Sequence, residues 1–563
     1  MDADDLVLIN GDVITLDPAP GKARVQAIAI RGDRIRVAGT DHDALAARGP
    51  RTRVVDLGGR TVIPGLIDGH AHLDREGLRD IFPNLKGCHS IADIQDRIRA
   101  LAAATPPGEW IVTMPVGTPP YYFRPEATLA EGRFPNRHEL DAAAPNHPVY
   151  IRGIWGYWDK PPITSVANSL ALSRAGVTRD TAPPASMVAI EHDADGEPTG
   201  IFREHAHVPV LEFTTFAGVP RFTHEHRVRG LRTAMARALS AGTTSVYEAH
   251  GVAPEVQRVY RQLHEAGEMT VRAHLVLSPT WGTAAEGIEA IERWLPFASG
   301  RHGTGDAWLR FGGVFLGLGH PNDVTRILFD GLPYTAWGGF VEAEFEERDF
   351  HDLCLAAAAN RVRINTLVND ATTLATVLDV LEAVDRVHPI RDLRPVLEHL
   401  RDASPQAIRR MRDLGAIATT QPSAYIWKSG SAYLAAGGDP ERLCPHVDFD
   451  AEGLPWALST DNKPYSALWA LAAAVERRDR GGQVLGEGQR VTVERALRAL
   501  TLDAARLTFE EDDKGSIEAG KLADLAVLDR PIFECAPDEV RTLPVPLTTV
   551  GGRVVHEVAG GLA

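Results

Sequence analysis

Eight short apolar segments, most of them separated by amphipathic helical segments, constrain the fold of this chain more than any other feature. The first is VIPGLIDGHAH, from Val62 to His72. The other seven follow in chain order as TTSVYEAHG, TVRAHLVLSP, LRFGGVFLGLG, RVRINTLVN, RPVLEHL, AIATTQP and LPWALSTD. Intervening stretches such as HRVRGLRTAMARALSAG have the apolar spacing of amphipathic helices. This alternation predicts an α/β protein with a (β/α)8 TIM-like barrel over residues 63–507.

The two ends of the chain have a different pattern. Residues 1–62 contain short β-rich runs with turn sequences at Asn10-Gly11 and Gly32-Asp33. Residues 508–563 repeat this style in GSIEAGKLADLAVLD and TTVGGRVVHEV. Because both ends bring matching strands and little else to bury, they predict one small β-sandwich domain built from 1–62 and 508–563. Two unrelated β appendages are the alternative.

One connection breaks the regular spacing of the barrel. About 160 residues separate the first predicted strand from the second, far more than an ordinary βα loop contains. We expect residues 74–235 to form a lid or insertion region over the active face. Its aromatic residues favour an apolar or aromatic substrate if they line the site, and ordinary packing is the alternative. They are Tyr121, Tyr122, Phe123, Trp155, Tyr157 and Trp158.

Composition excludes several classes of partner. The formal net charge is −16 and the 563 residues contain no basic run, so neither nucleic acid nor an anionic membrane is an expected partner. The N-terminus is acidic and no apolar run reaches the length of a membrane span, so we expect a soluble, cytoplasmic protein. The four cysteines form no CxxC motif and are predicted to be free thiols.

Polar side chains at three strand ends suit a divalent metal ion. His70 and His72 lie two residues apart at the end of the first strand, so their side chains point the same way. His399 ends the sixth predicted strand and Asp461 ends the eighth. In barrels of this kind the catalytic residues lie at the C-terminal ends of the strands. A metal needs three or four ligands of this kind, and it lowers the pKa of water from about 16 to about 7. A carboxylate such as Asp461 can then carry the proton.

These segments make the chain similar to the metal-dependent amidohydrolase superfamily, and within it to amidohydrolase family 3, which includes N-substituted formamide deformylase-like proteins. The resemblance covers nearly the whole length. It is carried by PGLIDGHAH, RHELDAAAPNHPV, DADGEPTGIFREHA, LEH at 397–399, the Asp461 strand and GSIEAGKLADLAVLD. It implies metal-site roles for His70, His72, His399 and Asp461. Asp461 would be the proton shuttle, and His399 a further ligand or a donor to the substrate carbonyl.

Two positions depart from the family pattern. Where the family commonly has a lysine that bridges two metals, this chain has Phe315 in FGGVFLGLG. Where a fifth-strand histidine is usual, it has Asn365 in INTLVND. Phe cannot bind a metal and Asn binds Zn²⁺ poorly, so we expect one ion per chain, with Zn²⁺ favoured over Mn²⁺, Fe²⁺ or Co²⁺.

Other side chains near strand ends could substitute for the missing ligands. Glu248 is the strongest candidate, because a carboxylate can complete a metal shell; an acid that supports the ligands from behind or caps a helix is the alternative. His250, His274 and His320 are further candidates, and core packing is the expected role of His274.

The resemblance implies hydrolysis of a carbon–nitrogen bond of amide, N-acyl or N-formyl type in a small molecule. A heterocycle deaminase or cyclic amide hydrolase with one metal is a second hypothesis. A third, from another class, is a metal-poor relative that binds a ligand or acts without hydrolysis, for example as a decarboxylase. Relatives are often dimers, so a homo-oligomer is compatible with the resemblance.

Overall fold

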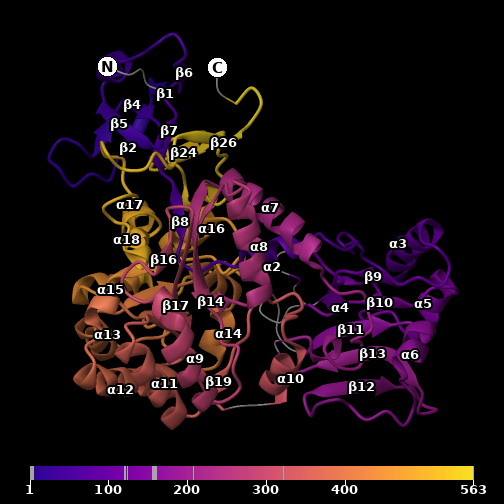
Figure 1. Ribbon diagram of the computed structural model, residues 1–563. Coiled ribbons are helices and arrows are strands. Elements are labelled where there is room, and N and C mark those ends of the chain that lie inside the picture. The colour runs from indigo at the N-terminus through magenta and orange to yellow at the C-terminus, as the bar shows by residue number, and fades with distance from the viewer. Residues whose placement is uncertain are drawn as a thin grey trace.

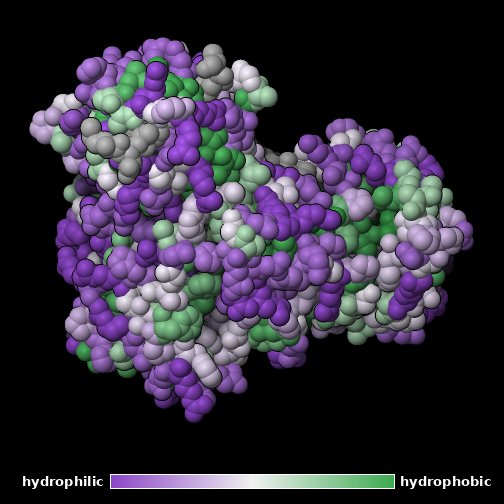
Figure 2. All heavy atoms as spheres, turned by 45° about the horizontal axis from the view of Figure 1, so that its top comes forward, coloured by the Kyte–Doolittle hydropathy of each residue, from purple (hydrophilic) through white to green (hydrophobic). Residues whose placement is uncertain are grey.

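The computed structural model describes residues 5–118, 122, 125–154, 162–206, 208–320 and 323–561. Figure 1 shows three parts: a barrel at the lower left, strands from both chain ends above it, and a lobe that projects to the right. None of the described helices is long and apolar enough to cross a membrane. The face drawn in Figure 2 is mainly hydrophilic, and its hydrophobic areas are small and scattered.

The barrel consists of eight parallel strands in chain order. They are β8 (Leu66–Asp68), β14 (Thr243–Val252), β15 (Arg272–Leu277), β17 (Leu309–Phe315), β20 (Ile364–Leu367), β21 (Val396–Glu398), β22 (Ile417–Thr420) and β23 (Trp456–Leu458). Backbone hydrogen bonds join the two end strands, from Gly69 N to Leu458 O (3.2 Å) and from Asp461 N to His70 O (2.8 Å). The predicted barrel and its eight strands are therefore confirmed.

Side chains on each strand alternate between the barrel interior and the surrounding helices. Ile67, Val396, Ile417 and Ala457 belong to one buried cluster, which also contains residues of α18 (Leu502–Ala505). Their strand neighbours, such as Leu397, pack in the larger cluster that includes the outer helices. This two-sided burial explains why the strands read as continuous apolar runs. It also assigns each strand residue to one side of the barrel wall.

Helices cover the outside of the barrel between successive strands (Figure 1). The amphipathic segments of the sequence form α7 (His224–Ser240), α8 (Pro254–Glu265), α11 (Glu347–Ala359), α12 (Ala371–Val387), α13 (Pro405–Asp413) and α16 (Ala467–Glu476). Local sequence fixes where they begin. The Thr223 side chain accepts a hydrogen bond from a backbone N–H of α7, and Asp370 does the same for α12.

Strands from the two chain ends meet above the barrel. One sheet contains β5 (Arg34–Gly39), β4 (Ala27–Arg31), β1 (Leu6–Ile9) and β6 (Arg53–Asp56) in that order. The other contains β26 (Arg553–Glu557), β25 (Leu547–Val550), β24 (Leu525–Leu528), β7 (Thr61–Pro64), β2 (Asp12–Ile14) and β3 (Arg24–Val25). Both sheets contribute to one hydrophobic cluster. A separate sandwich domain with boundaries at 62 and 508 stays a prediction.

The long connection between β8 and β14 contains a folded lobe. Its five-stranded sheet has the order β12 (Val188–His192), β13 (Pro198–Glu204), β11 (Ile163–Ala167), β10 (Val149–Ile151) and β9 (Ile111–Thr113). Helices α3 (Ile91–Ala104), α5 (Arg137–Ala143) and α6 (Ser169–Ala175) lie in the same lobe (Figure 1). Of the six aromatic residues singled out in the sequence, only Tyr122 lies within the described residues, and it is buried in a hydrophobic cluster with Trp337. A lid role for 74–235 stays a prediction.

Candidate metal centre

The histidine pair lies directly after β8, where the first and last strands of the barrel meet. Asp68 ties the two strands together: Oδ1 accepts hydrogen bonds from His70 N (3.2 Å) and Thr460 N (2.9 Å), and Oδ2 accepts one from the Thr460 hydroxyl (2.5 Å). Burial raises the pKa of Asp68 to about 7. Gly69 allows the close approach, because a Cβ there would lie 2.9 Å from Leu458 O. The IDGHAH sequence thus fixes where the two histidines emerge.

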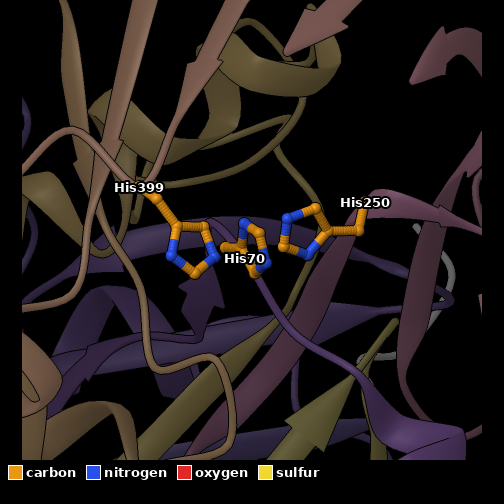
Figure 3. A group of neighbouring side chains, drawn as sticks. All are labelled: His70, His250 and His399. Carbon is orange, nitrogen blue, oxygen red and sulfur yellow. Dashed lines mark hydrogen bonds between the residues drawn. The ribbon is translucent and has the colours of Figure 1, made fainter. Parts of the chain in front are cut away.

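Four imidazoles from three strands converge at this point. His70 Nε2 lies 3.2 Å from His72 Nε2 and 3.3 Å from His399 Nε2. His250, near the end of β14, places Nδ1 3.4 Å from His72 Nε2. Figure 3 shows His70 between His250 and His399. Burial lowers the pKa of all four well below the usual value, so each ring is neutral and has a nitrogen lone pair to offer a metal.

Asp461 lies beside the imidazoles but is bound by two cations. Oδ1 lies 3.4 Å from His72 Nε2, and Oδ2 lies 3.8 Å from His399 Nε2. Arg75 Nη2 donates to Oδ1 at 2.6 Å, and the Lys463 ammonium pairs with Oδ2. Burial alone would raise the pKa of this carboxyl, but Lys463 and Arg75 outweigh burial and hold it well below its usual range. Asp461 is therefore ionised.

Two overlapping triads could hold an ion, and both contain His70. One consists of His70, His72 and Asp461, the other of His70, His250 and His399, and the ligand atoms within each lie within 4.8 Å of one another. Ligands about 2.0–2.1 Å from a tetrahedral Zn²⁺ are separated by about 3.3–3.4 Å. The three imidazole nitrogen separations given above, 3.2–3.4 Å, match this value, so the residues fit a divalent ion. All four predicted site residues lie here, while their role as ligands stays a prediction.

His250, rather than Glu248, lies among the candidate ligand atoms. Glu248 Oε1 accepts hydrogen bonds from Leu73 N (2.9 Å) and the Tyr260 hydroxyl (2.6 Å). Its Oε2 lies 3.8 Å from His72 Nδ1, on the side of the ring away from the other imidazoles. This arrangement places Glu248 behind His72, which is the second of the two roles considered for it.

The remaining candidates lie outside the cluster. His274 stacks on Tyr247, and its Nε2 lies 3.3 Å from Gly312 O, which is core packing as predicted. His320 is on the surface, where it pairs with Glu346 at 2.8 Å.

The structure also shows where the two residues that depart from the family pattern lie. Phe315 presents an apolar ring whose centroid is 5.1 Å from that of His250. The Oδ1 of Asn365 accepts a hydrogen bond from the Tyr247 hydroxyl at 2.6 Å, which leaves it committed to the barrel interior.

Polar groups that we did not predict from the sequence lie behind the imidazoles. Glu398 Oε2 is 3.7 Å from His70 Nδ1, and Glu342 Oε1 is 3.4 Å from His250 Nε2. The Tyr425 hydroxyl hydrogen-bonds His399 Nδ1 at 2.5 Å. Burial, with Glu342 nearby, raises the pKa of Glu398 well above its usual value. Partners of this kind fix the orientation of metal-binding histidines. The Glu398-His399 pair in LEH was the available signal.

Three site residues have backbone conformations that L-residues rarely adopt. The φ angles of His399, Asp461 and Asn462 are 58°, 51° and 55°, in the left-handed region. Asn462 Oδ1 accepts a hydrogen bond from His72 N at 2.5 Å, which ties the last strand end to the first. Such conformations cost of order 1–3 kcal/mol each and concentrate at functional sites.

Comparison with known proteins shows what the whole chain resembles. A sequence profile described as the amidohydrolase family matches residues 53–556. The N-substituted formamide deformylase of Arthrobacter pascens is 28% identical over 99% of both chains. A metal-dependent hydrolase structure from Pyrococcus horikoshii has a TM-score of 0.67 and 21% identity, covering 95% of this chain and 99% of that one.

A zinc-bound adenosine deaminase from Xanthomonas campestris has a TM-score of 0.52 and 16% identity, covering 99% of this chain and 94% of that one. At these identities the structural similarities establish the fold alone. The profile match over residues 53–556 establishes more: the chain belongs to the amidohydrolase family.

Proposed function

We propose that this protein hydrolyses a carbon–nitrogen bond of amide, N-acyl or N-formyl type in a small molecule, using one divalent ion, most simply Zn²⁺. The observation that carries the proposal is the pair of triads around His70, because neutral imidazoles and a carboxylate at barrel strand ends are the ligands Zn²⁺ prefers. The relationship to a protein named N-substituted formamide deformylase supports an amide substrate.

The residues divide into three roles in this proposal. His70 is common to both triads and holds the ion, together with His72 and Asp461 or with His250 and His399. A divalent ion held there would act as a Lewis acid: it would polarise a carbonyl group and lower the pKa of water, so that hydroxide is available to attack. His399 either completes the ligand set or donates a hydrogen bond to the substrate carbonyl.

Asp461 is the proposed proton shuttle. Lys463 and Arg75 keep the carboxyl ionised, so it is available to accept a proton from the attacking water and then pass it on. The leaving nitrogen is then the acceptor, because an amine anion cannot depart unprotonated.

Metal content and hydrolysis test the proposal together. Zinc per chain would be measured by elemental analysis for wild type and for His70→Ala, His72→Ala and His250→Ala, with the surface variant His320→Ala as the matched control. We expect about one ion in wild type and in the control, and loss of the ion in His70→Ala, because both triads need that imidazole.

The other two variants identify the triad. Loss in His72→Ala alone assigns the ion to His70, His72 and Asp461, and loss in His250→Ala alone assigns it to the three histidines. Wild type that takes up no zinc, manganese, iron or cobalt would refute the metal-dependent reaction. A metal-loaded enzyme that releases ammonia from heterocyclic amines but cleaves no N-formyl or N-acyl amine would establish the deaminase hypothesis instead.

A further inference from the structure

Gln421 is a buried amide beside the candidate centre whose hydrogen-bonding groups are not used by the protein. The residue directly follows β22 and its side chain is fully buried. Within the described part of the chain, neither Oε1 nor Nε2 has a hydrogen-bond partner. Its main-chain carbonyl is satisfied, by Ala424 N and Tyr425 N at 3.0 Å each. Burying an amide with no partner is unfavourable, so the position calls for a ligand.

Barrel topology places this amide between two of the candidate metal ligands. Strand β22 pairs with β21 on one side and β23 on the other. His399 directly follows β21 and Asp461 lies three residues after β23, and Thr419 O accepts a hydrogen bond from Leu400 N, the residue after His399. Extended past the paired residues, this register places Gln421 beside residue 400, next to His399, and beside residue 459, two residues before Asp461.

Strand alternation directs the side chain toward the barrel interior. Ile417 packs inside the barrel with Val396 and Ala457. Thr419 and Gln421 lie two and four positions after Ile417. If the alternation of the strand continues through Gln421, their side chains point to the same face as that of Ile417. We therefore place the amide on the inner side of the wall, at the catalytic end of the barrel.

The segment after Gln421 has an irregular helical form that is common at functional sites. Ser423–Lys428 form a π-helix. This π-helix carries Tyr425, whose hydroxyl contacts His399 Nδ1. The same short segment therefore supports a candidate ligand and presents the unused amide.

Asn365 provides an internal comparison. It is also an amide in the barrel interior with no exposed surface, but its Oδ1 accepts a hydrogen bond from the Tyr247 hydroxyl. The protein supplies a partner for the amide deeper in the barrel and leaves the one near the metal ligands for something else.

We propose that the Gln421 side chain binds the amide group of the substrate, with Oε1 accepting a hydrogen bond from the N–H of the scissile amide. An acceptor at this position selects amides that retain an N–H, so the substrate class is N-monosubstituted amides and formamides rather than N,N-disubstituted ones. This inference rests on the proposed function and narrows its substrate.

The test compares N-butylformamide with N-butyl-N-methylformamide, which lacks the N–H, on the zinc-loaded wild type and on Gln421→Met. Methionine keeps the length and unbranched shape of glutamine without its hydrogen-bonding groups. We expect wild type to prefer the N–H substrate in kcat/KM by about tenfold to a hundredfold, and the variant to lose that preference. Zinc content should be unchanged, and the melting temperature should be unchanged or higher, because an unsatisfied amide has been removed.

Calorimetric titration of both formamides separates this inference from the proposed reaction. If wild type hydrolyses neither compound but binds N-butylformamide more tightly than Gln421→Met does, the reaction fails and the subsite stands. If wild type and Gln421→Met show the same substrate preference and bind N-butylformamide equally well, the subsite is refuted, whereas the proposed hydrolysis is unaffected. A variant that melts lower and loses zinc would also overturn it, because the amide would then be structural.

Discussion

The two ends of the barrel interior bury charged and polar groups in different ways. At the N-terminal end, opposite charges meet at hydrogen-bond distance. Arg272, the first residue of β15, forms two bonds of 2.7 and 2.9 Å to the carboxylate of Asp524, and Lys514 lies 2.7 Å from Glu510. The first pair connects a barrel strand to the C-terminal part of the chain, the second lies within that part, and each charge has a close counter-charge.

At the C-terminal end, Asp461 also pairs closely with Arg75 and Lys463, but Glu398 and the imidazoles face one another at longer distances. His70 and Glu398 are separated by 3.7 Å, and His250 and Glu398 by 3.9 Å. Within the residues that the structure describes, both oxygens of Glu398 and both amide atoms of Gln421 have no hydrogen-bond partner. This difference agrees with the proposed function, in which one end stabilises the fold and the other binds an ion and a substrate.

Removing the charge of Asp461 should produce the largest functional effect. In Asp461→Asn the shape is kept but proton transfer is lost, so we expect kcat to fall by about 10²–10⁴-fold on an N-formyl amine. Zinc content would be measured in parallel, because retention of the ion assigns it to the three-histidine triad. A variant with zinc and near wild-type kcat would show that Asp461 is not the shuttle.

Breaking a pair at the opposite end should affect stability and leave the site intact. Asp524→Asn leaves the Arg272 guanidinium buried without its counter-charge, and we expect a loss of about 3–5 kcal/mol in the free energy of unfolding. Urea unfolding measures the loss, while zinc content and kcat of the folded enzyme should match wild type. A variant of normal stability that fails to bind zinc would contradict the proposed division between the two ends.

Glu398 should influence metal affinity rather than folding. Replacing it by Gln keeps its volume and weakens its support of His70, so we expect zinc affinity to fall about tenfold to a hundredfold. Competition with a chelator measures the affinity, and Glu346→Gln, a surface acid paired with His320, is the matched control. Equal affinities in both variants would mean that Glu398 does not support the ligand.

Acidification should weaken the stabilising Lys514–Glu510 pair at the N-terminal end, with a smaller effect than the substitutions above. Burial opposes ionisation of Glu510, but Lys514 and its hydrogen bonds lower the pKa to about 2. Because the native state binds fewer protons than the unfolded state, this stabilisation is fully present above the usual carboxyl pKa and is lost as pH falls toward 2.

The stability gap between wild type and Lys514→Met should therefore narrow by about 1–2 kcal/mol between pH 6 and pH 3. Urea midpoints at intermediate pH values measure the gap. A gap that stays constant or widens on acidification would show that Glu510 is not held ionised by Lys514.

The sequence by itself determined the fold and most of the candidate ligands. Period and apolar content identify strands that are buried on both faces, and parallel strands must bring their ends to one edge. His70, His72, His399 and Asp461 could thus be assigned to one site although 391 positions separate the first from the last. The resemblance to the amidohydrolase family was needed in addition to recognise Phe315 and Asn365 as departures, because only the family pattern says which side chains are usual there.

Only the tertiary structure decided which groups complete the site. His250 and Glu248 lie two residues apart on β14, and strand alternation alone cannot say which reaches the ligands, because the pairing of β14 with β15 is irregular between Glu248 and Val252. The positive φ angles of His399 and Asp461 likewise turn side chains in directions that a regular strand would not. Contacts such as that of Arg75 with Asp461 depend on how distant chain segments meet after folding, and a one-dimensional pattern does not contain that information.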